Sequence, residues 1–195
     1  LASLTSGPVI NALTGDVIAQ VENGGFSLDD PEVALSKATG EFLERLMLLP
    51  SSKDTMIYAS VQELKGRAKR FLSPASVSGF SDEQKVKDGR FKLEEHSRLY
   101  WVRGRSFPEK KEVLLPAQLV FWHYDQSKVA EPMIRESNTN GAAGMFTQDE
   151  ALAYGIRELI QRESFLIFWL NKIAPPRIDS STIMDSGVRR ILKTM

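Results

Sequence analysis

Cysteine is absent from this chain of 195 residues, and histidine is nearly absent. Without cysteine, disulfide bonds, thiolate nucleophiles and cysteine metal sites are excluded, and the composition fits a reducing cytoplasm, where we expect the protein to reside. His96 and His123 are the two imidazoles that could act as a base. His123 lies in an apolar run that predicts a strand, so we expect a hydrogen-bonded core histidine there rather than a base.

Neither sign of charge is in excess, because 25 Lys and Arg side chains balance 25 Asp and Glu side chains. A neutral chain does not attract nucleic acid or an anionic membrane through its net charge, so we expect neither as a partner. Long apolar runs are missing as well. The longest strongly apolar stretch, residues 165–170, is too short to cross a bilayer, and the N-terminus does not resemble a signal peptide. We therefore expect a soluble protein.

Two segments have the apolar spacing of helices. The first, residues 31–47, has Asp30 as a candidate cap and a proline at its first position, and Pro50 follows its end. The second, residues 148–171, follows Thr147, which has capping-box spacing to Glu150. Length and composition predict that both helices belong to one domain, or to a large part of one.

The rest of the chain predicts a β-rich middle and a short hairpin near the N-terminus. Residues 6–25 are rich in β-branched residues, Gly and Pro, as in a hairpin. Residues 98–107 and 112–125 predict two strands of a meander. Residues 82–95 are charged with few apolar anchors and predict a mobile surface loop. We expect Trp101, Trp122 and Trp169 in the core.

The two predicted helices resemble each other. Ala34, Leu35, Glu41 and Arg45 recur 117 positions later as Ala151, Leu152, Glu158 and Arg162, and Gln161 takes the place of Glu44. At about 100° per residue, each helix then has a stripe of small residues that ends in an acid and an arginine. This repeat predicts that the two acidic ends have related roles.

The acids permit two interpretations. Glu41 with Arg45, and Glu158 with Arg162, have the spacing of ordinary ion pairs on a helix surface. Alternatively, carboxylates at i and i+3 suit Mg²⁺, which prefers a few carboxylates together with the oxygens of bound phosphates. Surface pairs need no small-residue stripe, which favours a shared ligand cleft. The next turn, with Phe165, Leu166 and Trp169, would then fill the core.

Residues 138–144, with the sequence NTNGAAG, also permit two interpretations. A turn rich in glycine that precedes a helix can bring backbone N–H groups close to a phosphate. Clusters of Gly and Asn are, however, more often plain turns.

Three segments resemble, in their order, the YcaO family: GGFSLDDPEVALSKATGEFLER, then RLYWVRG with EVLLPAQLVFWHY, then SNTNGAAGMFTQDEALAYGIRELIQRESFLIFWLNKIAPPRID. The resemblance implies an α/β (α+β) fold with helices packed on a mainly antiparallel sheet and the two related helical motifs facing a nucleotide cleft. Such proteins use ATP and Mg²⁺ to activate a backbone amide of a ribosomally made peptide. In the best-known branch, a cysteine, serine or threonine side chain then closes an azoline ring.

The resemblance also implies site residues. The metal ligands implied are Glu41, Glu44, Glu158 and Gln161, and the ATP contacts implied are Arg45, Asn140, Glu150 and Arg162. Three positions depart from the family pattern. Gln161 stands where the family usually has glutamate, so one metal position should be weaker, and Met145 and Phe146 replace a glycine and an asparagine. The pattern identifies no catalytic residue.

The family domain is longer than this chain, so residues 1–195 resemble its N-terminal part, and we expect its last acidic motif beyond Met195. The isolated chain is accordingly expected to be inactive. The resemblance implies a precursor peptide as substrate and leaves room for a leader-binding partner protein and for a homodimer. The alternative is a degenerate or truncated YcaO-like module that docks a peptide or a partner protein without catalysis.

Overall fold

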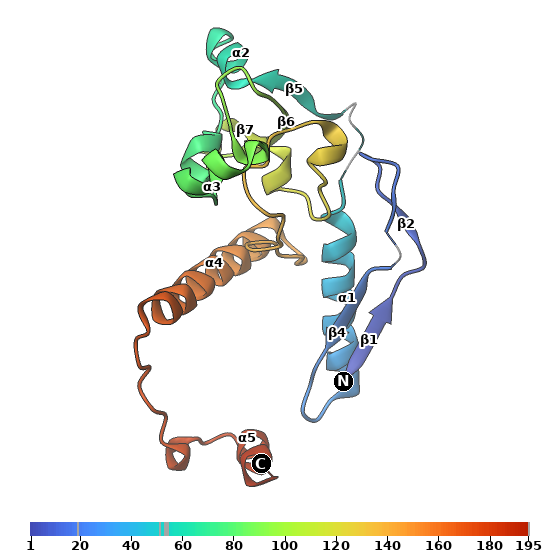
Figure 1. Ribbon diagram of the computed structural model, residues 1–195. Coiled ribbons are helices and arrows are strands. Elements are labelled where there is room, and N and C mark those ends of the chain that lie inside the picture. The colour runs from blue at the N-terminus through green and yellow to red at the C-terminus, as the bar shows by residue number, and fades with distance from the viewer. Residues whose placement is uncertain (19, 51, 53–54, 195) are drawn as a thin grey trace. The chain divides into compact units, whose positions relative to one another are not determined.

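The structure is a computed structural model that describes residues 1–18, 20–50, 52 and 55–194. It forms two compact units. Unit 1 comprises Leu1–Thr5, Glu22–Glu44 and Asn140–Met195, and unit 2 comprises Ser6–Val21 and Arg45–Thr139. Helix α1 (Pro31–Met47), labelled in Figure 1, has residues 31–44 in unit 1 and residues 45–47 in unit 2. That residues 1–195 belong to a single domain stays a prediction.

In unit 1, helix α1 lies against a two-stranded antiparallel sheet of β1 (Ala2–Thr5) and β4 (Glu22–Gly25). The start of the helix is as predicted, because Asp30 Oδ1 accepts hydrogen bonds from the first turn. A Cβ at Gly25 would lie 1.9 Å from the carbonyl oxygen of Ala34. Ala34 and Ala38, both buried, therefore form the surface on which β4 packs. Close packing explains this part of the small-residue stripe.

Helix α4 (Gln148–Asn171) also has the predicted bounds. The Thr147 hydroxyl accepts from the backbone N–H of Glu150 at 3.3 Å and donates to its carboxylate at 2.8 Å. The helix ends at Lys172, whose φ of 53° is left-handed. A short 3₁₀ turn, η6 (Ser180–Thr182), and helix α5 (Ser186–Thr194) follow.

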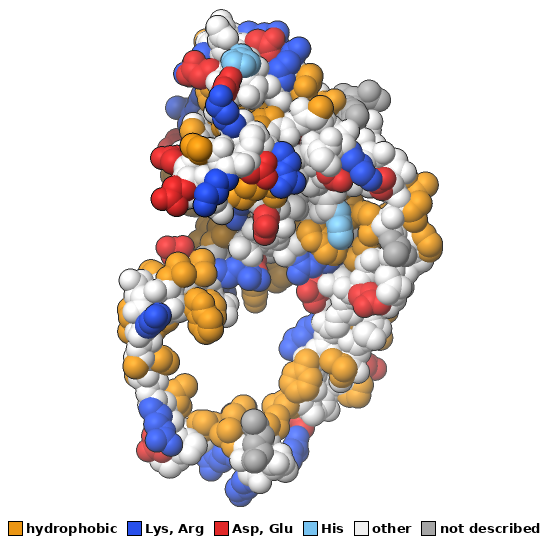
Figure 2. Space-filling model, in the orientation of Figure 1, with side chains coloured by type: hydrophobic (Ala, Val, Ile, Leu, Met, Phe, Trp, Pro, Cys, Tyr) orange, Lys and Arg blue, Asp and Glu red, His pale blue; other side chains and the backbone are white. Residues whose placement is uncertain are grey.

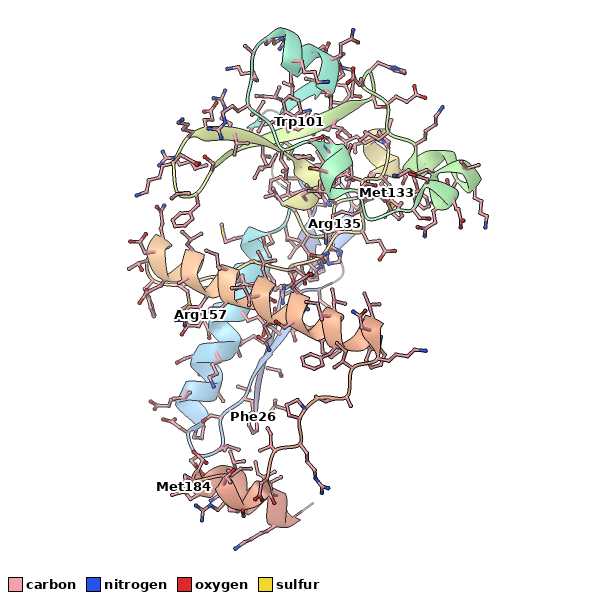
Figure 3. The ribbon with its side chains drawn as sticks, turned by 90° about the vertical axis from the view of Figure 1, so that its left-hand side faces the viewer. Phe26, Trp101, Met133, Arg135, Arg157 and Met184 are labelled. Atoms are coloured by element: carbon pink, nitrogen blue, oxygen red, sulfur yellow. The ribbon has the colours of Figure 1, made fainter. Side chains whose placement is uncertain are left out.

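The second half of α4 is exposed, which contradicts the prediction that Phe165, Leu166 and Trp169 fill the core. Phe165 is 61% exposed and Trp169 is 70% exposed. Six successive apolar residues, 165–170, cover every side of the helix, so burial would require neighbours on every side. An apolar groove of about 720 Å³ lies beside Phe165, Trp169 and Ile173. Figures 2 and 3 show this apolar end and its side chains. No helix in the described ranges is long and apolar enough to cross a membrane.

Unit 2 contains the main sheet, which is antiparallel with the order β5 (Ile57–Ser60), β6 (Arg98–Arg105), β7 (Glu112–Pro116). Trp101 is fully buried at its centre, with its indole N–H donating to the carbonyl of Ala59 at 2.9 Å (Figure 3). The core around it comprises Ala59, Val61, Leu64, Leu99, Leu114 and Ile134. A small hairpin of β2 (Val9–Ile10) and β3 (Val17–Ile18) lies within the predicted hairpin region.

Three predictions in unit 2 are wrong. The second meander strand ends at Pro116, which is followed by the 3₁₀ turns η4 (Ala117–Leu119) and η5 (Ser127–Val129). His123 is therefore outside any strand, exposed and left-handed at φ 55°, not a core residue. Residues 82–95 contain α3 (Asp82–Lys87) and η3 (Gly89–Phe91) instead of an unstructured loop, because the side chains of Ser81 and Asp88 cap them.

The remaining elements of unit 2 are α2 (Val61–Gly66) and the 3₁₀ turn η2 (Pro74–Val77). Of the three tryptophans expected in the core, Trp101 is buried, Trp122 is half-buried and Trp169 is exposed. The mixture of helices with small antiparallel sheets confirms the predicted α+β class.

Candidate functional site

Two of the predicted acids meet on one short turn of unit 1. Residues 140–144, called the glycine turn below, precede helix α4. The N–H of Gly141 donates to Glu158 Oε2 at 2.9 Å, and the N–H of Gly144 donates to Glu44 Oε2 at 2.8 Å. One acid comes from α1 and the other from α4, so the glycine turn connects the two related helices through their acidic ends.

Small residues allow this close approach. A Cβ at Gly155 of α4 would lie 2.5 Å from the carbonyl oxygen of Gly141, which is shorter than any real contact of that kind. On the other side, a Cβ at Gly144 would lie 3.2 Å from the Cβ of Glu44. Gly141 itself has φ 82°, which is readily adopted by glycine. Gly155, a member of the predicted stripe, therefore leaves room for the backbone of the turn against α4.

Glu158 also makes the ion pair expected from the alternative interpretation. Its Oε1 lies 2.8 Å from the guanidinium of Arg162, one helical turn away. The pair is partly exposed, with 29% of the Glu158 side chain and 51% of the Arg162 side chain accessible. An exposed pair of this kind stabilises a helix only slightly. Glu158 thus combines a surface ion pair with an inward bond to the glycine turn.

The remaining predicted ATP contacts and metal ligands lie in different surroundings from one another. Glu150 accepts from the Thr147 hydroxyl and so has a capping role. The guanidinium of Arg45 lies 5.7 Å from the ring centroid of Trp122, within unit 2. Asn140 and Gln161 are exposed, and Glu41 is half-buried on α1. Their assignment to ATP or to metal stays a prediction.

The chemistry of the acids fits Mg²⁺, which binds carboxylate oxygens together with phosphate oxygens and water. The described residues contain no group of three His, Cys, Asp or Glu side chains that could hold a metal ion as arranged. Glu44 and Glu158 instead accept N–H groups of the glycine turn. That Glu41 and Glu158 point into a common cavity stays a prediction.

Unit 2 holds a buried acid that the sequence did not reveal. Glu131 is 8% exposed, and its carboxylate accepts from the N–H of Tyr100, from Gln118 Nε2 at 3.2 Å and from the Tyr124 hydroxyl at 3.0 Å. Burial raises the pKa of Glu131 to about 7, although the three donors act in the opposite direction. The same burial raises the pKa of the Tyr124 hydroxyl. The partners lie 7, 13 and 31 residues from Glu131 and share no helix or strand with it, so no helix or strand periodicity could have identified this network.

Unit 2 also has a polar pocket of about 390 Å³, lined by Asn11, Asp16, Ile18, His123, Tyr124, Asp125 and Gln126. The Asn11 side chain donates to the His123 carbonyl at 3.0 Å and holds the left-handed backbone there. Partial desolvation of the His123 imidazole lowers its pKa below the ordinary value.

The sequence profile of the YcaO family, described as YcaO cyclodehydratase, ATP- and Mg²⁺-binding, matches residues 28–195. This chain belongs to the YcaO family. The YcaO match includes both related helices and the glycine turn between them. An uncharacterized protein of Methanothermobacter thermautotrophicus is 29% identical over 108 residues, which cover 55% of this chain and 27% of the relative.

Solved structures share the YcaO fold. A heterocyclase in complex with substrate and cofactor has a TM-score of 0.74 at 19% identity, covering 98% of this chain and 27% of the heterocyclase. YcaO from Methanopyrus kandleri, bound with AMPPCP and Mg²⁺, has a TM-score of 0.61 at 20% identity, covering 90% and 39%. The heterocyclase TruD has a TM-score of 0.64 at 21% identity, covering 83% and 24%. The chain thus spans about a quarter of the length of the first relatives, and likeness at these identities shows the fold alone.

Proposed function

We propose that this chain is the ATP- and Mg²⁺-binding part of a YcaO enzyme that activates a backbone amide of a peptide. The observation that carries the proposal is the pair of bonds from Glu44 and Glu158 to one glycine turn. The two acids belong to motifs that resemble each other, and they come from helices far apart in the sequence. Ordinary surface ion pairs would not require both acids to converge on the same few residues.

In this proposal, Glu41, Glu44 and Glu158 hold Mg²⁺, with the Gln161 amide oxygen as a weaker ligand. When bound, Mg²⁺ supplies positive charge that offsets the charge of the triphosphate. Arg162, which now pairs with Glu158, is available for a charge-assisted contact to a phosphate oxygen.

The remaining ATP contacts of the proposal are Arg45, Asn140 and Glu150. Arg45 lies on α1 and belongs to unit 2. Asn140 opens the glycine turn, and Glu150 lies in the first turn of α4.

The proposed substrate is a ribosomally made precursor peptide in the cytoplasm. The sulfhydryl or hydroxyl of a cysteine, serine or threonine of that peptide would lose its proton and add to a backbone amide carbon, and the amide oxygen would take the γ-phosphoryl group of ATP with release of ADP. The C=N bond of the azoline would form as that oxygen leaves as phosphate and the nitrogen loses its proton. The structural likeness to a heterocyclase in complex with substrate and to TruD supports this choice of reaction. The proposal includes a leader-binding partner protein and leaves room for a homodimer.

The second candidate is a YcaO-like binding module without catalysis. Gln161 at a position where the family usually has glutamate, and Phe146, fully exposed where the family often has asparagine, favour it. Such a module would bind a peptide or a partner protein without consuming ATP.

Calorimetry with AMPPCP and Mg²⁺ on the full-length protein tests the proposal. Glu158→Gln should weaken Mg²⁺-dependent binding about tenfold or more, because charge-assisted contacts contribute on the order of 1.5 to 3 kcal/mol. Glu163→Gln is the matched control, since this exposed acid of the same helix is outside the proposed site. Equal affinities in both variants would argue against the metal site. Binding without peptide-dependent ATP consumption would favour the binding module.

A further inference from the structure

The polar pocket of unit 2 has more hydrogen-bond acceptors than its own donors use. Asp16 Oδ2 accepts from Lys128 Nζ at 2.6 Å and from the Thr14 hydroxyl at 2.7 Å. Asp125 Oδ1 accepts from the backbone N–H and the hydroxyl of Ser127 at 3.0 and 2.6 Å. The second carboxylate oxygen of each aspartate accepts no hydrogen bond from the described residues. Both carboxylates therefore have an oxygen left for a ligand.

A buried amide adds a third acceptor to the pocket. The Gln126 side chain is 8% exposed and lines the pocket. Its nitrogen faces the Gln118 side-chain oxygen and the Arg135 carbonyl, both at 3.5 Å. Since both neighbours are acceptors, the amide nitrogen has to lie on their side and the amide oxygen on the other. That oxygen accepts no hydrogen bond from the described part of the chain, and it is in contact with solvent.

The network around Glu131 fixes this orientation of the amide. Gln118 Nε2 donates to the Glu131 carboxylate at 3.2 Å and to the Pro132 carbonyl at 3.1 Å. The Gln118 oxygen then accepts from the N–H of Ile134 at 2.8 Å and from Gln126. A buried acid that has no part in the proposed nucleotide site thus orients an amide of the polar pocket.

The charges of the pocket suit one cation. Hydrogen bonds from Lys128 and Thr14 hold the pKa of Asp16 below its ordinary value, so this carboxylate is ionised at neutral pH. Asp125 supplies a second carboxylate, so the two acids and the Lys128 ammonium together leave one negative charge. None of the described residues that line the pocket is Lys or Arg. A ligand that is positively charged and rich in donors fits these surroundings.

The His123 imidazole adds a planar ring to the pocket. Its ring centroid lies 4.0 Å from that of Trp122, and the imidazole makes no hydrogen bond with the described residues. Asn11, which is buried, donates to the carbonyl of His123 and so keeps this residue at the pocket. A guanidinium can stack on a ring while it donates to carboxylates in its own plane, whereas an ammonium has no plane. The ring therefore favours a guanidinium.

We propose that the polar pocket binds the side chain of an arginine in a peptide. The guanidinium donates to the second oxygens of Asp16 and Asp125 and to the Gln126 oxygen. A volume of about 390 Å³ is at the small end for ligand pockets and suits one side chain. Free arginine has a carboxylate as well, which the two acids would repel, so a peptide is the better source. The inference goes beyond the proposed function, because no residue of the pocket is assigned there to ATP or Mg²⁺.

Saturation-transfer NMR titration of the full-length protein, without ATP or Mg²⁺, tests the inference. The probe is N-acetyl-arginine N-methylamide, and the control is its citrulline analogue, which has a similar shape without the charge. The arginine probe should bind at least about fivefold more tightly than the citrulline analogue, as expected for about 1 kcal/mol from a partly exposed charge pair. It should also bind more tightly than free L-arginine. Equal affinity for the arginine and citrulline probes would overturn the inference, and tighter binding of free L-arginine would overturn the assignment to a peptide.

Three variants locate the binding. Asp125→Asn keeps an oxygen for Ser127 and should weaken binding of the arginine probe about fivefold. Lys128→Met should tighten binding, because it removes the ammonium that competes for Asp16, and a misfolded protein would not show such a gain. Glu109→Gln changes an exposed acid of unit 2 outside the pocket and is the control.

The variants also separate this inference from the proposed function. If the arginine probe binds and neither Asp125→Asn nor Lys128→Met changes its affinity, the probe binds elsewhere and the inference is wrong. Calorimetry with AMPPCP and Mg²⁺ decides the proposed function independently, because these titrations contain neither ligand.

Discussion

The carboxylate of Glu44 accepts a hydrogen bond from the backbone N–H of Gly144, 2.8 Å away and 100 residues later in the sequence. This bond ties the acidic end of α1 to the turn that leads into α4. Glu158 holds the same turn from α4, so the turn depends on both related motifs. A change in either acid should therefore alter a segment to which it is not adjacent in sequence.

Replacement of Gly155 by alanine should displace the glycine turn. The added Cβ would lie 2.5 Å from the carbonyl oxygen of Gly141, a backbone atom that moves only with the turn. We expect a loss of about 1 to 3 kcal/mol in the free energy of unfolding, measured in urea. Gly40→Ala is the matched control, because no atom lies near a Cβ there and alanine favours a helix by about 1 kcal/mol. Equal effects of the two substitutions would contradict the packing described for the turn.

Truncation of Trp101 should change the free energy of unfolding much more than truncation of Trp169. Trp101 is fully buried, so Trp101→Ala should lower the free energy of unfolding by about 3 to 5 kcal/mol. Trp169 is 70% exposed, so in the isolated chain Trp169→Ala should change it by less than about 1 kcal/mol. Urea titration of each variant, followed by circular dichroism, provides the comparison. A large loss from Trp169→Ala would show that the end of α4 is packed in solution.

Glu131 should make stability depend on pH. Its folded pKa of about 7 lies above the ordinary value of 4.5, so burial favours the protonated form. The contribution of this group is fully present below pH 4.5 and is lost as the pH rises through about 7. Over that window it should lower the free energy of unfolding by about 3 kcal/mol.

Glu131→Gln isolates this dependence from that of the other acids. The difference in unfolding free energy between wild type and variant, measured from pH 4 to 8, should change with the slope expected of one proton. Gln cannot ionise, and its amide would oppose the Gln118 and Tyr124 donors, so the variant should also be less stable at low pH. A difference that is constant across the range would show that Glu131 keeps an ordinary pKa.

Gln161→Glu should strengthen the metal site if Gln161 lines it. A carboxylate in place of the neutral amide adds a charged ligand, and we expect Mg²⁺ affinity in the full-length protein to rise about tenfold. Calorimetry with Mg²⁺ measures the change. Ser164→Glu adds the same charge elsewhere on exposed α4 and serves as the control. Similar gains in both variants would mean that the effect is general electrostatic attraction instead of ligation.

The sequence by itself determined the local elements. The bounds of α1 and α4 follow from Asp30, Thr147 and the helical spacing of apolar residues, and these signals act within a few residues. The α+β class and the membership of the YcaO family were likewise readable from the order of segments. The pairing of Glu158 with Arg162 needed no more than their spacing along one helix.

Only the tertiary structure decided which residues meet and which are buried. The bonds from Glu44 and Glu158 to the glycine turn, and the network around Glu131, join residues that do not share a helix or strand. The apolar sequence at the end of α4 led to the wrong prediction that this end is buried. Apolar residues on all sides of a helix become buried only where neighbours surround it. Helical spacing depends on neighbouring residues, whereas these contacts depend on the path of the whole chain.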